Sequence, residues 1–266
     1  MLLSLFLVLW RDYAVTASPL DKNFEIANGE IVDDPAELSF LCRMHLRGWS
    51  KSHFCGATLV APDFAVTAKH CVSNGISWDF YSLCLDVEDC YVACRDLSRV
   101  GYDVGQFRVS ILDAFWKSGP SDLAVIQLKE KVHEHKDYDK GVPIVFATLA
   151  TKEPEEGDEV LTAGWGETGF REGFSEQLRK LKLKVTSVEK LWVKTDFTNE
   201  KGEVADPCDG DSGGPLLIRR QANWEVVGTL LVNTNGSTLI FYFLGVRRSG
   251  PCRFLSRRVN HNYCYG

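Results

Sequence analysis

The segment Gly-Asp-Ser-Gly-Gly-Pro at residues 210–215 constrains the fold of this chain more than any other stretch. Glycines on both sides of Ser212 let the backbone turn sharply and leave the serine hydroxyl beside backbone N–H groups. Taken alone, the segment is equally typical of a plain glycine-rich turn. A nucleophilic serine also requires a base and a carboxylate that orients the base, so the rest of the chain decides between these two interpretations.

Two further segments supply the missing groups. His70 lies in Val-Thr-Ala-Lys-His-Cys at residues 66–71, directly after an apolar strand, and Asp122 lies in Ser-Asp-Leu-Ala-Val-Ile at residues 121–126, at the start of another. Each has an ordinary explanation by itself, a core imidazole for the first and a capped turn for the second. The presence of all three groups in one chain favours a catalytic interpretation in which Ser212 is the nucleophile.

The rest of the chain has the pattern of an all-β protein. Past residue 25, short runs of β-branched and aromatic residues are separated by Gly, Pro, Asn and Asp, and helix is expected only in a short turn at residues 68–72. A soft boundary near residues 137–141 leaves two halves of similar length, which favours two packed β-barrels over one sandwich. The predicted strands span residues 36–44, 54–61, 106–112, 123–129, 159–164, 178–185, 214–218 and 224–231.

The chain resembles the trypsin/chymotrypsin family of secreted serine endopeptidases. The resemblance lies in the order His70, Asp122, Ser212 along the chain and in the local segment around each residue. Three further segments share this resemblance: Ile-Ala-Asn-Gly at residues 26–29, Phe-Cys-Gly-Ala-Thr-Leu-Val at residues 54–60 and Ala-Gly-Trp-Gly at residues 163–166. The likeness covers nearly all of residues 26–264. It implies two packed six-stranded antiparallel Greek-key β-barrels with the active site in the cleft between them.

The resemblance assigns a role to each candidate residue. Ser212 attacks the scissile carbonyl, His70 takes the serine proton and later gives it to the leaving amine, and Asp122 holds the imidazole in the right tautomer. The backbone N–H groups of Gly210 and Ser212 form the oxyanion hole. The same resemblance implies that neither a metal nor another cofactor is needed.

The first residues indicate export. Residues 2–10 form an apolar run that is too short to span a bilayer, and small residues follow it. We therefore expect a signal peptide at residues 1–17, a secreted and extracellular protein, and no membrane attachment after the signal is removed.

The family resemblance also implies a zymogen. Residues 18–25 are then the propeptide, and residues 26–266 the mature domain, with an amino-terminal barrel at about 26–140 and a carboxyl-terminal barrel at about 141–266. The amino group released at Ile26 is expected to pair with Asp211.

That ion pair would order the oxyanion loop. The residue before the cut is Glu25, where the family usually has Arg or Lys. A trypsin-like activator is therefore not expected to cut this chain, and the activating protease stays open.

The family resemblance makes Asp206 the expected floor of the substrate pocket. It lies six residues before Ser212, and a carboxylate there favours Lys or Arg before the scissile bond. The strand that pairs with the substrate backbone is expected near residues 245–252, where Arg247 or Arg248 could fold over Asp206 and neutralise it. Efficient turnover therefore stays open at this stage.

These departures keep a second class of function in view. A secreted endopeptidase is favoured, acting on a protein or peptide substrate and also bound by protease inhibitors. The alternatives are a poorly active or non-proteolytic binding or regulatory protein of the same fold, and an esterase that acts on non-peptide substrates. Turnover of small peptide esters separates them, because it requires Ser212 and His70 to work together.

Nine cysteines in an exported chain indicate disulfides, and the odd number leaves one over. The resemblance implies two bridges, Cys55 with Cys71 and Cys208 with Cys252. At the positions of a third family bridge stand two apolar residues, Val160 and Ile218, which are expected to fill the same space. The sequence does not pair the remaining cysteines, which are Cys42, Cys84, Cys90, Cys94 and Cys264.

Composition argues against nucleic acid as a partner. The 266 residues are 45% hydrophobic and 25% charged, as in an ordinary folded protein, and the formal net charge of −6 leaves no basic surplus for nucleic acid. A monomer is expected. Asn235 in Asn-Gly-Ser is the candidate N-glycosylation site.

Overall fold

The structure is a computed structural model dominated by β-strands. In the part it describes there are fourteen strands and two short 3-10 helices, η1 (Pro35–Leu38) and η2 (Lys69–Cys71). None of the helices in this part has the length and apolar character needed to cross a membrane. The described residues are 29–46, 53–72, 81–85, 107–111, 122–128, 131–132, 145–167, 173–175, 177–189, 192–196, 198–205, 207, 210–231 and 239–243.

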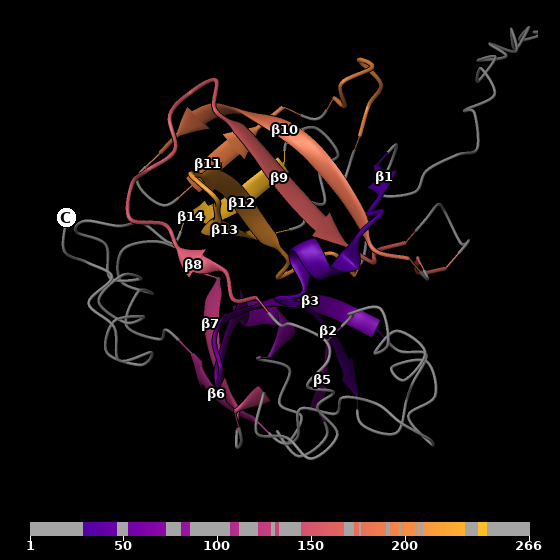
Figure 1. Cartoon of the computed structure of the whole chain (residues 1–266), viewed down its shortest axis with the longest axis vertical. Coiled ribbons are helices and arrows are strands. Elements are labelled where there is room, and N and C mark those ends of the chain that lie inside the picture. Colours follow the sequence, from indigo (N-terminus) through magenta and orange to yellow (C-terminus); the bar gives the residue numbers. More distant parts are fainter. Residues whose placement is uncertain are drawn as a thin grey trace, which may run out of the picture.

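Six of the strands form one antiparallel sheet, drawn in indigo to magenta in Figure 1. Their order across the sheet is β5-β2-β3-β4-β7-β6. These strands are β2 (Leu41–Leu46), β3 (His53–Ala61), β4 (Phe64–Ala68), β5 (Tyr81–Leu85), β6 (Phe107–Ile111) and β7 (Leu123–Leu128).

The second sheet closes on itself. Six antiparallel strands follow the order β9-β10-β11-β14-β13-β12, and β12 pairs back with β9, so these strands form a barrel. Two short strands join it, β1 on β10 and β8 parallel to β13. The strands are β1 (Glu30–Ile31), β8 (Thr148–Leu149), β9 (Glu159–Gly164), β10 (Arg179–Val188), β11 (Trp192–Thr195), β12 (Pro215–Arg220), β13 (Asn223–Leu231) and β14 (Leu239–Phe243).

Strand β10 shows how the sequence specifies this barrel. Leu181, Leu183 and Val185 are buried, while the side chains of Lys182 and Lys184 between them face outward. This period of two is what one buried face of a strand requires. The three apolar side chains belong to a core that also contains residues of β11, β12 and β13.

A larger core joins the two sheets. It contains most of the buried side chains of β2, β3, β4 and β7, and also Leu161, Leu217 and Val226 from the second sheet and Trp165, which follows β9. Figure 1 shows the two groups of strands facing each other, with the indigo strand β1 lying beside β10 of the other sheet. Residues from both halves of the chain therefore meet at the junction between the sheets.

The all-β prediction is confirmed, and the fold is that of two packed β-barrels. The predicted strand at residues 159–164 coincides with β9. The strand predicted at residues 36–44 begins only at Leu41, because residues 35–38 form the 3-10 helix η1, which begins at Pro35. The short turn predicted at residues 68–72 contains η2.

Val160 and Ile218 stand at the two positions where the family resemblance implies a third bridge. Both are buried, and both belong to the core of the second barrel. Their strands β9 and β12 pair with each other at the neighbouring residues Leu161 and Leu217. The two side chains therefore fill this part of the barrel by apolar packing.

Candidate active site

His70 and Asp122 are brought together by one strand pair. Strand β4 ends just before η2, which carries His70, and pairs with β7, which begins directly after Asp122, so that Ala68 lies opposite Leu123. Beyond this pair, Lys69 N donates to Asp122 O at 3.0 Å. The antiparallel register therefore places the histidine and the aspartate next to each other although they are 52 residues apart.

The Asp122 carboxylate holds His70 at two points. His70 N donates to Oδ1 at 2.8 Å, and the imidazole Nδ1 lies 2.5 Å from Oδ2. The Asp122 side chain is 14% exposed and the His70 side chain 44% exposed. With the proton on Nδ1 donated to the carboxylate, Nε2 keeps its lone pair and is available as a base.

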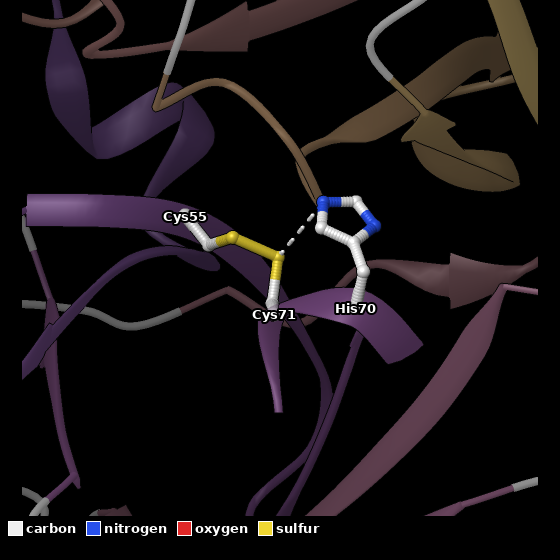
Figure 2. Close-up of side chains that lie close together, drawn as sticks. All are labelled: Cys55, His70 and Cys71. Atoms are coloured by element: carbon white, nitrogen blue, oxygen red, sulfur yellow. Dashed lines mark hydrogen bonds between the residues drawn. A yellow bond between two sulfur atoms is a disulfide. The ribbon is translucent and has the colours of Figure 1, made fainter. Parts of the chain in front are cut away.

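A disulfide lies against the imidazole. Cys55 on β3 and Cys71 at the end of η2 are bonded to each other, as Figure 2 shows, and Cys71 Sγ lies 3.7 Å from His70 Nε2. The same sulfur lies 3.7 Å from the backbone oxygen of Ser212. The histidine and the serine segment therefore meet at one sulfur atom.

The segment around Ser212 forms a tight turn between the two sheets. Gly210 and Gly213 have φ angles of +94° and +78°, which glycine adopts without strain. Gly214 N donates to Asp211 O, and Gly213 N donates to Leu230 O, each at 2.9 Å. Within the described part of the chain, no hydrogen bond engages the N–H groups of Gly210 or Ser212.

Asp211 is buried beside the segment that contains Trp165. Gly166 N donates to its Oδ1 at 2.7 Å, and a Cβ added at Gly164 or Gly166 would overlap the carboxylate. These two glycines therefore let the backbone approach Asp211 closely. Asp211 is 4% exposed, so its carboxylate depends on hydrogen bonds from the protein.

Several predicted site residues lie outside the described residues, so their predicted roles stay untested. These are Ile26, Asp206, Cys208, Asn235 and Cys252, together with Glu25, Arg247, Arg248, Cys90, Cys94 and Cys264. Of the other unassigned cysteines, Cys84 lies in β5, and Cys42 is buried in β2 with its Sγ 3.8 Å from Phe40 O. The signal peptide and the propeptide also lie outside the described range.

Sequence reasoning missed several groups that hold the Ser212 turn. Gly56 N donates to Ser212 O at 2.8 Å, and Leu230 N donates to Gly214 O at 2.8 Å. The strand against this turn is therefore β13, which the sequence predicts at residues 224–231, whereas the strand expected near residues 245–252 lies outside the described residues. The signal available was Val-Val-Gly-Thr-Leu-Leu at residues 226–231, the end of a run already predicted to be a strand.

One group of side chains has ligand-like spacing for a metal. Atoms of Cys55, His70 and Cys71 lie within 4.8 Å of one another. The two sulfurs are bonded to each other and are not thiolates, which metal binding requires. We therefore interpret the group as a disulfide that packs against the imidazole.

Comparison with protein families agrees with this geometry. The family model described as Trypsin matches residues 32–243, which is most of the chain. The chain belongs to the trypsin family. The matched range contains every strand of the two sheets except β1, and the segments of His70, Asp122 and Ser212.

Curated relatives from this family cover similar shares of the chain. The chain is 30% identical over 219 residues to trypsin theta of Drosophila erecta, covering 76% of this chain and 75% of the relative. It is 28% identical to granzyme M of Rattus norvegicus, covering 72% of this chain and 74% of the relative. Other relatives are longer, since the matched part is only 11% of ovochymase of Halocynthia roretzi, at 26% identity over 66% of this chain.

A solved structure gives the same fold. Human heparin binding protein superposes with a TM-score of 0.62 at 21% identity, covering 88% of this chain and 96% of that one. At this identity the likeness concerns the fold. Together with the family match, this likeness shows that the two sheets have the trypsin fold.

Proposed function

We propose that this chain is a secreted serine endopeptidase that hydrolyses peptide bonds with Ser212, His70 and Asp122. The observation that carries the proposal is the pair of hydrogen bonds that joins His70 to the Asp122 carboxylate beside the Ser212 turn. Membership of the trypsin family supports it. A histidine held by a carboxylate and adjacent to a serine is the arrangement that activates a hydroxyl for attack on a carbonyl.

Each step uses a group in the proposed site. Ser212 Oγ attacks the scissile carbonyl carbon while its proton passes to His70 Nε2, and Asp122 stabilises the resulting imidazolium. The tetrahedral intermediate collapses when His70 returns the proton to the leaving amine, which leaves an acyl-enzyme at Ser212. Water then attacks the ester by the same proton transfers and frees the acid.

We assign the stabilisation of the oxyanion to the N–H groups of Gly210 and Ser212. Neither group is engaged by a hydrogen bond within the described residues. Removal of one such donor typically raises the activation free energy by about 3 kcal/mol. In this proposal the turn at Gly210 and Gly213 presents the oxyanion donors beside the nucleophile.

Activation is assigned to the amino group of Ile26 and the carboxylate of Asp211. Residue 29, three positions after Ile26, receives a hydrogen bond from Arg179 Nη1 at 3.2 Å, and Arg179 lies opposite Gly164 in the sheet. Gly164 abuts Asp211. Gly29 is thus joined through Arg179 to the strand pair whose Gly164 contacts Asp211, which supports this assignment.

We assign the primary specificity to Asp206 and propose cleavage after Lys or Arg. A carboxylate at the floor of a poorly solvated pocket favours a cationic side chain. Arg247 or Arg248 would weaken this preference by neutralising the carboxylate. The same proposal includes a signal peptide, the Cys208–Cys252 bridge and a glycan at Asn235.

Hydrolysis of fluorogenic peptides tests the proposal. The substrates differ only in the residue before the scissile bond, with Lys, Arg, Leu or Glu at that position. We expect turnover of the Lys and Arg peptides by protein that begins at Ile26, none by Ser212→Ala, and loss of the basic preference in Asp206→Ser. Equal turnover by wild type and Ser212→Ala would show that Ser212 is not the nucleophile.

A further inference from the structure

The hydroxyl of Thr67 lies where the segments of the proposed active site meet. Thr67 is fully buried in β4, three residues before His70, and it lies opposite Ala124 in the strand pair that positions Asp122. Its Oγ1 donates to Gly56 O at 2.7 Å and lies 3.5 Å from Met44 Sδ. The hydroxyl thus links β4 to β3.

Gly56 continues this link to the nucleophile segment. Its N–H donates to Ser212 O at 2.8 Å, and its carbonyl accepts from Thr67. A chain of two hydrogen bonds therefore joins Thr67 to the backbone of Ser212 through one residue. Cys55, which precedes Gly56, is bonded to Cys71 beside the imidazole.

The packing at this point leaves little room for adjustment. A Cβ added at Gly213 would overlap Thr67 Oγ1, and it would lie 2.6 Å from Gly56 O and 3.0 Å from Ala68 N. A Cβ added at Gly56 would lie 3.1 Å from Gly214 N. The backbones of β3, β4 and the Ser212 turn are thus in direct contact around the hydroxyl.

We propose that Thr67 is a positioning residue that, through Gly56, sets the distance between Ser212 and His70. The inference rests on the proposed function. A methyl group in place of the hydroxyl cannot approach Gly56 O to 2.7 Å, because it makes no hydrogen bond, and it leaves that buried carbonyl without this donor. The strain is relieved by a shift of Gly56 and of the Ser212 carbonyl bonded to it.

Such a shift acts on catalysis more than on substrate binding. A displacement of about 1 Å can cost on the order of a hundredfold in rate, since nucleophile and base must be aligned. Thr67 is fully buried, so its side chain offers no surface to a substrate. We therefore expect kcat to fall while KM stays unchanged.

The chain offers a matched control. Thr58 on β3 is also fully buried, and its Oγ1 has no hydrogen-bond partner in the described structure. Thr58→Val makes the same chemical change as Thr67→Val at a hydroxyl that bonds nothing. Thr67→Ser and Thr67→Ala form a second pair, which differ by the hydroxyl alone.

The experiment measures the rate at which a fluorophosphonate labels Ser212 and the kcat and KM for a peptide ester. We expect Thr67→Val to lower the labelling rate and kcat by about 10- to 100-fold at constant KM. Thr58→Val should match wild type. Thr67→Ser should retain most of the rate, and Thr67→Ala should lose it. Urea unfolding of each variant shows which proteins are folded.

The outcomes separate the two proposals. Wild-type protein that begins at Ile26 and is folded but not labelled would overturn the proposed function, and the role of Thr67 with it. Labelling of Thr67→Val at the wild-type rate, or an equal loss in Thr58→Val, would overturn the role of Thr67 alone. If Thr67→Val does not fold, equal rates in Thr67→Ser and Thr67→Ala would likewise overturn that role.

Discussion

Replacing Gly213 by alanine tests how tightly the nucleophile turn is packed between the sheets. Gly213 has a φ of +78°, and an added Cβ would meet Thr67 Oγ1, Gly56 O and Ala68 N. The exposed Gly202 has nearly the same φ, +77°, and an added Cβ there meets nothing within 4 Å. The two positions therefore share the backbone strain, but only at Gly213 would an added Cβ overlap neighbouring atoms.

The expected costs follow from these two terms. A left-handed φ costs alanine about 1–2 kcal/mol, which is the whole effect expected for Gly202→Ala. Overpacking in a tight interior adds about 1–3 kcal/mol, so Gly213→Ala is expected to lose roughly 2–5 kcal/mol of its free energy of unfolding. That loss is a large part of the about 5–15 kcal/mol typical of a folded protein.

Urea unfolding followed by tryptophan fluorescence measures both variants, and fluorophosphonate labelling measures their site. Gly202→Ala should label at the wild-type rate, whereas Gly213→Ala should be less stable and should label much more slowly. A Gly213→Ala protein that is no less stable than Gly202→Ala and labels as wild type would refute the tight packing of this junction.

Other expectations follow from the site and its surroundings. Asp122→Asn should lower kcat for a peptide ester by about 10⁴-fold with little change in stability, and a small decrease would argue against the proposed role of the carboxylate. Removal of the Cys55–Cys71 bridge by alanine at both positions should cost about 3 kcal/mol for a loop of 16 residues, which thermal unfolding would reveal as a lower Tm. The hydrogen bond from Lys182 lowers the pKa of Glu200 below 4.5, so the small stability that this pair contributes is present above the ordinary pKa and is lost as pH falls through the lowered one. An NMR titration should show the midpoint of Glu200 rising in Lys182→Met, and an unchanged midpoint would contradict the assignment.

Strands bounded by clear turn residues were predictable from sequence. Strand β9 has the predicted bounds because its apolar run is preceded by Gly157 and Asp158, which mark the turn. Strand β11 was missed because it has four residues, and β14 was missed because a continuous apolar run of five does not distinguish strand from helix.

The candidate site was predictable only in part. The motifs named His70, Asp122 and Ser212, since each lies in a distinctive local segment. The contacts of Thr67 and Gly56 with the Ser212 turn join segments far apart in the chain, and no local pattern specifies them. The glycine within a predicted strand was the one available hint, because such a residue often marks a close approach of another backbone.

Intact-mass analysis after fluorophosphonate treatment tests the central claim most directly. The protein is engineered to begin at Ile26, and Ser212→Ala is the control. We expect one adduct on the wild-type protein and none on the control, because only an assembled Ser212, His70 and oxyanion hole react in this way. Folded, correctly trimmed wild-type protein that takes up no adduct would contradict the claim that this chain is a serine endopeptidase.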